Sequence, residues 1–170
     1  MNMANKMLPN QVAQALIERD WTIALAESCT GGLVCATLTE LSGSSAWFER
    51  GYITYSNQAK AECLNVPAEM IDSFGAVSEQ VAKAMALGAQ QNAGVNVAIA
   101  ITGIAGPTGG SPTKPVGTVC FSWAIRPELF NGVTNSVNTK TIHFEGDRQA
   151  IRQQACDFAL SELLLLLKNS

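Results

Sequence analysis

The sequence predicts an α/β fold in which helices cover both faces of one sheet. Short apolar runs of strand type alternate along the chain with longer segments whose apolar residues recur at helical spacing. The length of 170 residues fits a single domain. Only 15% of the residues are charged and 47% are hydrophobic, a composition that buries a core and excludes global disorder.

The first half of the chain predicts two strands, each followed by helical segments. Val12 and Leu16 share one face of the first expected helix, and residues 1–10 are expected to form a loose N-terminal extension. Pro67 suits the first turn of a later helix. The expected elements are a helix over 10–20, a strand over 21–26, a helix over 33–41, a strand over 51–55, and helices over 57–64 and 67–74.

The second half continues the alternation. Ser78 is a typical N-cap with Glu79 favourable in the first turn, and Gly94 ends the helix that follows. Residues 95–102 form a continuous apolar run, which is typical of a strand buried on both faces. The remaining expected elements are a glycine- and proline-rich loop over 103–117, strands over 118–125 and 137–144, and a long final helix capped by Asp147.

Composition excludes several classes of function. The net charge of −3 and the lack of a basic stripe argue against a nucleic-acid partner. His143 is the only histidine, which excludes zinc sites that need two. Five cysteines without a CxxC pair predict free thiols in a reducing compartment. Because no signal sequence and no run of the ~20 apolar residues that a membrane span needs is present, we expect a cytoplasmic protein without a membrane partner.

The first candidate group lies in the segment 26–32, Ala-Glu-Ser-Cys-Thr-Gly-Gly. Ser28 falls between the end of a strand and the start of a helix, where open α/β sheets bind their ligands. The N–H groups of residues 30–32 suit a phosphate or an oxyanion. Two alternatives stand beside this hypothesis. The serine or the nearby threonine could only cap the helix, or Cys29 could be the nucleophile at a helix start.

The second candidate group is the pair Tyr55 and Lys60, five residues apart across a strand–helix corner. A lysine activates a serine only when it is desolvated and neutral, and a nearby tyrosine can relay the proton. Both side chains could therefore face one pocket. The alternative is that Lys60 is an ordinary solvated surface charge.

The third candidate segment is the glycine-rich loop that begins at Thr102. Four glycines after a buried strand allow the backbone to approach a ligand closely, and a loop of this length in a small domain is often functional. It is not a P-loop, because the pattern GxxxxGK[ST] is absent.

Other conspicuous residues have structural interpretations. His143 lies on the last expected strand and is interpreted as a structural histidine beside a carboxylate. Trp47 and Phe48 follow a turn and would either anchor an interface or cover the core. The cysteines in apolar runs are expected in the core: Cys35, Cys63, Cys120 and Cys156.

Taken together, several motifs resemble the CinA C-terminal domain family, from about residue 11 to the end of the chain. They are the segment 26–32 already quoted, Gly-Ser-Ser-Ala-Trp-Phe-Glu-Arg-Gly at 43–51, Tyr-Ser-Asn-Gln-Ala-Lys at 55–60, Gly-Ala-Val-Ser-Glu at 75–79, Thr-Gly-Ile-Ala-Gly-Pro at 102–107, Lys-Pro-Val-Gly-Thr-Val at 114–119 and Gly-Asp-Arg at 146–148. The length is similar to that of the stand-alone form of the family, without the further N-terminal domain of its larger members.

This resemblance implies a three-layer α/β/α sandwich around one mixed sheet, and a homodimer. It implies hydrolysis of the amide of nicotinamide mononucleotide by a serine–lysine site without metal or cofactor. In that site Ser28 is the nucleophile, Lys60 its base and Tyr55 an assisting group. The implied substrate contacts are Thr30, Gly31, Gly32, Ser45, Asn57, Thr102, Gly103 and Arg148.

Alternatives stand beside the implied function and beside the role of Arg148. A non-catalytic nucleotide-binding module would keep the glycine loops without needing Ser28 and Lys60 together, and an amidase for another small amide would keep both. Arg148 could bind a substrate phosphate in two contacts, or pair at the surface with Asp147 or Glu145. The homodimer would have Trp47 and Phe48 near its interface.

Overall fold

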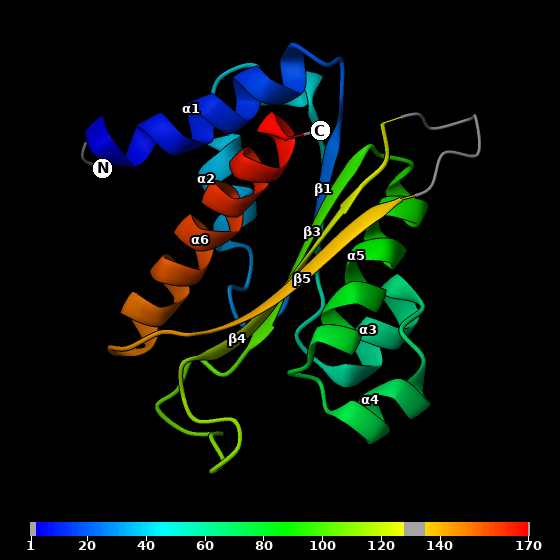
Figure 1. Ribbon diagram of the computed structural model, residues 1–170, viewed down its shortest axis with the longest axis vertical. Helices are drawn as coiled ribbons and strands as arrows, with labels where there is room; N and C mark the ends of the chain where they lie inside the picture. Colours follow the sequence, from blue (N-terminus) through cyan, green and yellow to red (C-terminus); the bar gives the residue numbers. More distant parts are fainter. Residues whose placement is uncertain (1–2, 128–134, 170) are drawn as a thin grey trace.

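A five-stranded sheet lies between two layers of helices in the computed structural model, which describes residues 3–127 and 135–169 (Figure 1). The strands are β1 (Ile23–Glu27), β2 (Phe48–Ile53), β3 (Val97–Gly103), β4 (Thr118–Ile125) and β5 (Ser136–His143). The helices are α1 (Met3–Ile17), α2 (Leu33–Thr39), α3 (Asn57–Leu64), α4 (Ala68–Phe74), α5 (Glu79–Ala93) and α6 (Arg148–Lys168), with a 3₁₀ turn over Ser44–Ala46.

The sheet is mixed, with the strand order β2-β1-β3-β4-β5. β1 pairs in parallel with both β2 and β3, whereas β4 and β5 continue the sheet in antiparallel pairing. The helix α2 connects β1 to β2 over one face, and α3, α4 and α5 connect β2 to β3 over the other. The two connections diverge between β1 and β3, which is the point where open α/β sheets bind ligands at their carboxyl edge.

Alternating side chains of β3 explain the two helical layers. Val97, Ile99 and Ile101 belong to the cluster formed with α1, α2 and α6. Ala98 and Ala100 belong to the cluster on the other face, with α3, α4 and α5. All five are fully buried, so the continuous apolar run reflects burial on both faces. The three-layer α/β/α sandwich is therefore confirmed.

The expected caps of α5 and α6 are also confirmed. Ser78 Oγ accepts the N–H of Val81 at the start of α5, and Gly94 ends that helix with φ 64°. Asp147 accepts the N–H of Ala150 at 2.8 Å and caps α6. These ends are set by local side chains and glycine geometry, which is why the sequence predicts them well.

The N-terminal boundary differs from the expectation. The helix α1 begins at Met3 and runs through Pro9, so residues 3–10 are helical rather than a loose extension, and residues 1–2 of the expected extension lie outside the described residues. The helix ends at Ile17 instead of residue 20, because Asp20 adopts a left-handed conformation with φ 54°. The second strand also lies earlier than expected, over Phe48–Ile53.

Trp47 covers the core rather than standing exposed. Its side chain is only 2% exposed, and it packs edge-on against Phe48, which is itself partly buried. Neither ring is therefore a fully exposed anchor in the single chain.

The histidine and the cysteines follow their structural interpretation with two corrections. His143 Nε2 lies 2.9 Å from the carbonyl oxygen of Val116, so its partner is a backbone group and not a carboxylate. Cys63 is exposed, because it lies on the outer side of α3 rather than in the core. Cys35 is partly buried, while Cys120 and Cys156 are buried as expected.

Two features are absent from the part of the chain that the structure describes. There, no helix has both the length and the apolar character to cross a membrane. Within the same residues, no three or more side chains of His, Cys, Asp and Glu come together in a way that could hold a metal ion.

Candidate active site

A pocket of about 290 Å³ opens at the carboxyl edge of the three parallel strands. Ser28 follows β1, Tyr55 comes shortly after β2, and Thr102 and Gly103 end β3. Arg148 reaches the same pocket from the start of α6. The sequence-predicted residues that line the pocket are Ser28, Tyr55, Asn57, Lys60, Thr102, Gly103 and Arg148.

A buried serine–lysine pair forms the floor of this pocket. Lys60 Nζ lies 3.0 Å from Ser28 Oγ and donates to the carbonyl oxygen of Thr54 at 2.9 Å. Lys60 is 1% exposed and Ser28 is 8% exposed. Ser56 caps α3 by accepting the N–H of Ala59, and this fixes the helix start that carries the lysine inward. Lys60 is therefore not a solvated surface charge.

Burial alters the proton affinity of Lys60. Desolvation lowers the pKa of its ammonium below the 10.5 of an ordinary lysine, while the nearby Cys29 acts weakly in the opposite direction. Both of its acceptors in the structure are neutral oxygens, from Ser28 and Thr54. A lysine in such surroundings releases its proton more readily, and the neutral amine can then accept the proton of the serine hydroxyl.

The rival nucleophile Cys29 is in a less favourable environment. Its side chain is 6% exposed, and burial raises the pKa of its thiol to about 12, although its own backbone hydrogen bond acts the other way. The reactive form of a cysteine is the thiolate. At neutral pH the Cys29 thiol therefore stays protonated and unreactive.

Glu27 is a site residue that the sequence reasoning missed. Its carboxylate is fully buried and accepts the N–H of Gly32 at 2.9 Å, of Val34 at 3.2 Å and of Cys35 at 2.8 Å. A carboxylate at a helix start interacts favourably with the helix dipole. The signal was present in the sequence, because a glutamate that ends an apolar strand needs buried donors.

Hydrogen bonds within this turn occupy the N–H groups of Gly31 and Gly32, which were expected to form an anion cradle with Thr30. The N–H of Gly32 is bonded to Glu27, and the N–H of Gly31 donates to the carbonyl oxygen of Ser28 at 3.0 Å. Thr30 is fully buried, and none of these three residues lines the pocket. Neither Ser28 nor Thr30 caps α2, whose N-cap is Gly32 without a side-chain bond.

Of the other expected substrate contacts, all but one line the pocket. Thr102 Oγ1 donates to the carbonyl oxygen of Ala76 at 2.8 Å and thereby holds the opposite wall of the pocket. At Gly103 a Cβ would lie 2.8 Å from Val119 and 2.9 Å from a backbone oxygen, so this position tolerates only glycine. Asn57 is exposed at the rim. Ser45 is exposed in the turn Ser44–Ala46 and does not line the pocket.

Arg148 bridges two sides of the pocket rim. Its Nη2 donates to Tyr55 Oη at 2.9 Å, and its Nη1 donates to the carbonyl oxygen of Gly106 at 2.8 Å. It does not pair with Asp147, whose carboxylate caps α6. Tyr55 is 60% exposed, and its hydroxyl contacts Arg148 rather than the buried pair. The rim therefore carries a guanidinium held by two neutral acceptors.

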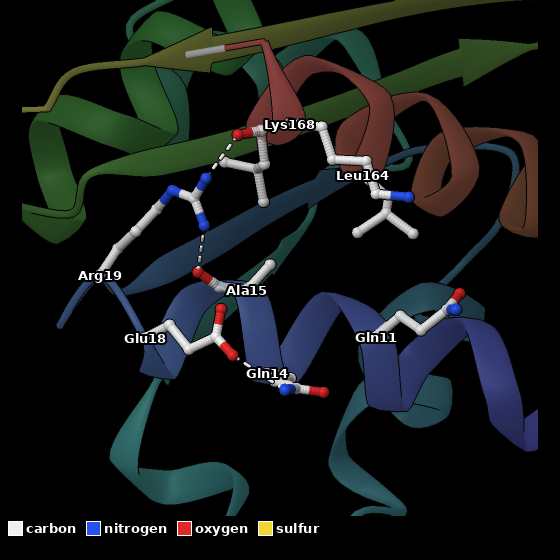
Figure 2. Close-up of a pocket in the computed structure, with 8 residues that line it drawn as sticks. Gln11, Gln14, Ala15, Glu18, Arg19, Leu164 and Lys168 are labelled. Carbon is white, nitrogen blue, oxygen red and sulfur yellow. Dashed lines mark hydrogen bonds between the residues drawn. The ribbon is translucent and has the colours of Figure 1, made fainter.

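A second pocket lies at the other end of α6, where that helix packs on α1 (Figure 2). Its volume is about 390 Å³. Arg19 donates there to the carbonyl oxygens of Ala15 at 2.9 Å and Leu167 at 2.5 Å. The 21 residues of α6 separate this end from Arg148, a span of about 30 Å for a regular helix. The lining residues include no serine or cysteine, so this pocket lacks a nucleophile of the kind found beside Lys60.

Comparison with protein families agrees with the sequence motifs. The model of the CinA C-terminal domain matches residues 5–167. The chain belongs to the CinA C-terminal domain family. The matched region includes every residue of the pocket described above.

Two kinds of relative share this CinA domain. A nicotinamide-nucleotide amidohydrolase PncC of Escherichia coli K12 is 50% identical over 157 residues, which cover 92% of this chain and 90% of that protein. The PncC of Enterobacter agglomerans is 48% identical over 91% of this chain and 90% of that protein. A CinA-like protein of Syntrophobacter fumaroxidans is 50% identical over 97% of this chain, but the match covers only 37% of that longer protein. The chain therefore spans about a third of the longer relatives.

Solved CinA structures share the whole fold. A CinA superfamily protein of Klebsiella pneumoniae matches with a TM-score of 0.90 and 38% identity, covering 100% of both chains. A competence/damage inducible protein of Agrobacterium tumefaciens also matches with a TM-score of 0.90 and 38% identity, over 99% of this chain and 98% of that one. The fold of this chain is thus shared with both solved structures along nearly their full length.

Proposed function

We propose that this chain hydrolyses nicotinamide mononucleotide to nicotinate mononucleotide and ammonia, with Ser28 as nucleophile and Lys60 as its base. The observation that carries the proposal is the buried hydrogen bond of 3.0 Å between Lys60 Nζ and Ser28 Oγ at the floor of the pocket. The names of the PncC relatives, which match at about half of all positions along nearly their full length, supply the substrate.

The first half of the reaction forms an ester on Ser28. Neutral Lys60 Nζ accepts the hydroxyl proton while Oγ attacks the carbonyl carbon of the substrate amide. The resulting tetrahedral intermediate collapses when the ammonium of Lys60 returns the proton to the amide nitrogen. The carbon–nitrogen bond then breaks, and ammonia leaves.

The second half consumes one water molecule. Lys60 is neutral again after ammonia leaves and accepts a proton from water as the water oxygen attacks the ester carbonyl. Oγ then leaves with the proton that Lys60 returns, and nicotinate mononucleotide is released. The same amine acts as base and acid in both halves, which is why its lowered pKa is central to the proposal.

The rim of the pocket suits the phosphate of the mononucleotide. The guanidinium of Arg148 offers parallel N–H groups, and its partners Tyr55 Oη and Gly106 O are neutral acceptors that a dianion can replace. A phosphate held at the rim anchors the substrate with its small amide near Ser28, so a contact remote from the reacting atoms supplies binding energy that lowers KM.

Assembly and location belong to the same proposal. We expect a homodimer in the cytoplasm, engaged in pyridine nucleotide recycling. The support is the resemblance to the family, together with the free thiols among the described residues. Sedimentation at micromolar concentration would contradict the dimer if it gave a species of 18.0 kDa.

Ammonia release tests the proposed function directly. The wild-type protein is incubated with nicotinamide mononucleotide, nicotinamide riboside, free nicotinamide, asparagine and glutamine, and ammonia is measured for each. We expect release from the mononucleotide well above all others. Binding of the mononucleotide without ammonia release would instead favour a non-catalytic binding module, and faster release from another amide would favour a different amidase.

A further inference from the structure

The turn that carries Ser28 contains two successive glycines in left-handed conformations. Gly31 has φ 56° and Gly32 has φ 97°. Glycine is the most permissive residue of the backbone, so a turn of this kind does not hold a nucleophile in place by its own stiffness. Contacts from elsewhere in the fold must restrain the turn. Glu27 restrains only its last part, because its carboxylate accepts N–H groups from Gly32 onward.

Arg152 on α6 restrains the remaining part of the turn. Its Nε donates to the carbonyl oxygen of Cys29 at 3.2 Å, and its Nη2 donates to the carbonyl oxygen of Thr30 at 2.8 Å. These two residues follow Ser28 directly, and both are buried. A planar guanidinium with two donors fixes the orientation of two successive peptide groups, which a single donor cannot do.

The positive charge of Arg152 also acts on the turn that carries Ser28, because no acidic side chain forms a salt bridge with it among the described residues. It donates its hydrogen bonds to the neutral carbonyl oxygens of Cys29 and Thr30. Burial and the negative charge of Glu27, both larger effects, raise the pKa of the adjacent Cys29 thiol, while the positive field of Arg152 acts to lower it. The same field favours negative charge on Ser28 and on the oxyanion that forms beside it.

We propose that Arg152 is a positioning residue of the hydrolysis, which orients and polarises the Cys29–Thr30 backbone behind Ser28. This inference rests on the proposed function. Arg152 does not line the pocket, whereas Arg148, one helical turn earlier on α6, does. The two arginines therefore have different effects: loss of Arg152 lowers kcat, and loss of Arg148 raises KM.

The test measures kcat and KM for ammonia release from nicotinamide mononucleotide in Arg152→Ala and Arg152→Lys. We expect kcat of Arg152→Ala to fall about 10–100-fold with little change in KM, since a misplaced reacting group costs up to about 100-fold. Arg152→Lys keeps the charge with poorer geometry, so its kcat falls less. Added guanidinium, below denaturing concentrations, restores part of the activity of Arg152→Ala, while methylammonium at the same concentration does not.

Arg19→Ala is the matched control. Arg19 likewise donates to two backbone carbonyl oxygens, of Ala15 and Leu167, but at the far end of α6. Its loss removes the same kind of contact without touching the Ser28 turn. We expect Arg19→Ala to lower the thermal midpoint and to keep the wild-type kcat.

Each outcome decides the inference. It is overturned if kcat of Arg152→Ala equals that of Arg19→Ala, or if KM rises while kcat stays unchanged, which would make Arg152 a substrate contact. If Arg152→Ala does not fold, Arg152→Lys decides, and a wild-type kcat in that variant overturns the inference. A wild-type protein that releases no ammonia from the mononucleotide refutes the proposed function itself, whereas an active wild type with an unaffected Arg152→Ala refutes only the role of Arg152.

Discussion

The floor and the rim of the pocket both carry a positively charged side chain, but they use it differently. At the floor, Lys60 is almost fully buried and contacts the oxygens of Ser28 and Thr54. At the rim, Arg148 is exposed and contacts the hydroxyl of Tyr55 and a backbone oxygen. Burial makes the lysine easy to deprotonate, whereas a guanidinium keeps its proton and can only bind. The floor of the pocket should therefore control the chemical step, and the rim should control substrate binding.

The largest expected effect is at Ser28. In Ser28→Ala the nucleophile is gone, and kcat for ammonia release from the mononucleotide should fall by several orders of magnitude. The protein should still fold, because the alanine keeps the backbone bond from residue 28 to Ile101. Cys29→Ala is the matched control and should stay near wild type. The reverse pattern would show that the thiol is the nucleophile.

Substitution of Lys60 should be almost as damaging. Loss of a general base typically costs about 10²–10⁴-fold in rate. Lys60→Arg should lose as much kcat as Lys60→Met, because arginine does not release its proton near neutral pH. An arginine variant with wild-type turnover would show that only the positive charge matters at the floor.

Lys60→Met also tests the cost of burying the amine. Burial lowers the pKa of Lys60 in the folded state, so the unfolded chain binds more protons between the two pKa values, and stability is lost as the pH falls through that range. Methionine fills similar space without this penalty. The thermal midpoint of Lys60→Met near pH 7 should equal or exceed that of wild type, and a large decrease would contradict the assignment of Lys60 as a destabilising buried charge.

A smaller effect is expected at the rim. Arg148→Ala should raise KM for nicotinamide mononucleotide about 10–100-fold, since hydrogen bonds to charged groups contribute ~1.5–3 kcal/mol. The reaction of nicotinamide riboside, which has no phosphate, should be slow in wild type and unaffected by this substitution. Equal kcat/KM for the two substrates in wild type would refute the phosphate requirement, and an unchanged preference in the variant would exclude Arg148 as its cause.

The smallest effect is expected at Tyr55. Tyr55→Phe keeps the ring and removes the acceptor of Arg148 Nη2, but Arg148 keeps its charge and its bond to the carbonyl oxygen of Gly106, so KM should rise only about 2–10-fold. A selective fall in kcat would instead support the proton relay that the sequence suggests. That result would assign Tyr55 a part in the chemical step rather than in substrate binding.

The sequence predicts the fold better than the site, for a physical reason. Strands, caps and helix faces depend on neighbours close in the chain, as Ser78 and Gly94 illustrate. The start of α1 departs from the usual local rule, because Pro9 lies inside the helix and not in its first turn.

Tertiary contacts explain what the sequence could not provide for the site. The desolvation of Lys60 depends on packing around α3, and a lysine taken alone is usually exposed. The N–H groups of Gly31 and Gly32 look free in the sequence, yet Glu27 and Ser28 accept their hydrogen bonds. Arg148 and Tyr55 meet across 93 positions of the chain. Only motif resemblance could connect such distant residues before the structure did.

The pH dependence of kcat/KM for ammonia release from nicotinamide mononucleotide tests the central claim, that a buried neutral Lys60 activates Ser28. Activity should be low at acidic pH and rise as the amine loses its proton. The midpoint of that rise should lie below the 10.5 of an ordinary lysine, because burial lowers the pKa of Lys60. A profile without such a rise, or a rise centred at or above 10.5, would contradict the assignment of Lys60 as the base.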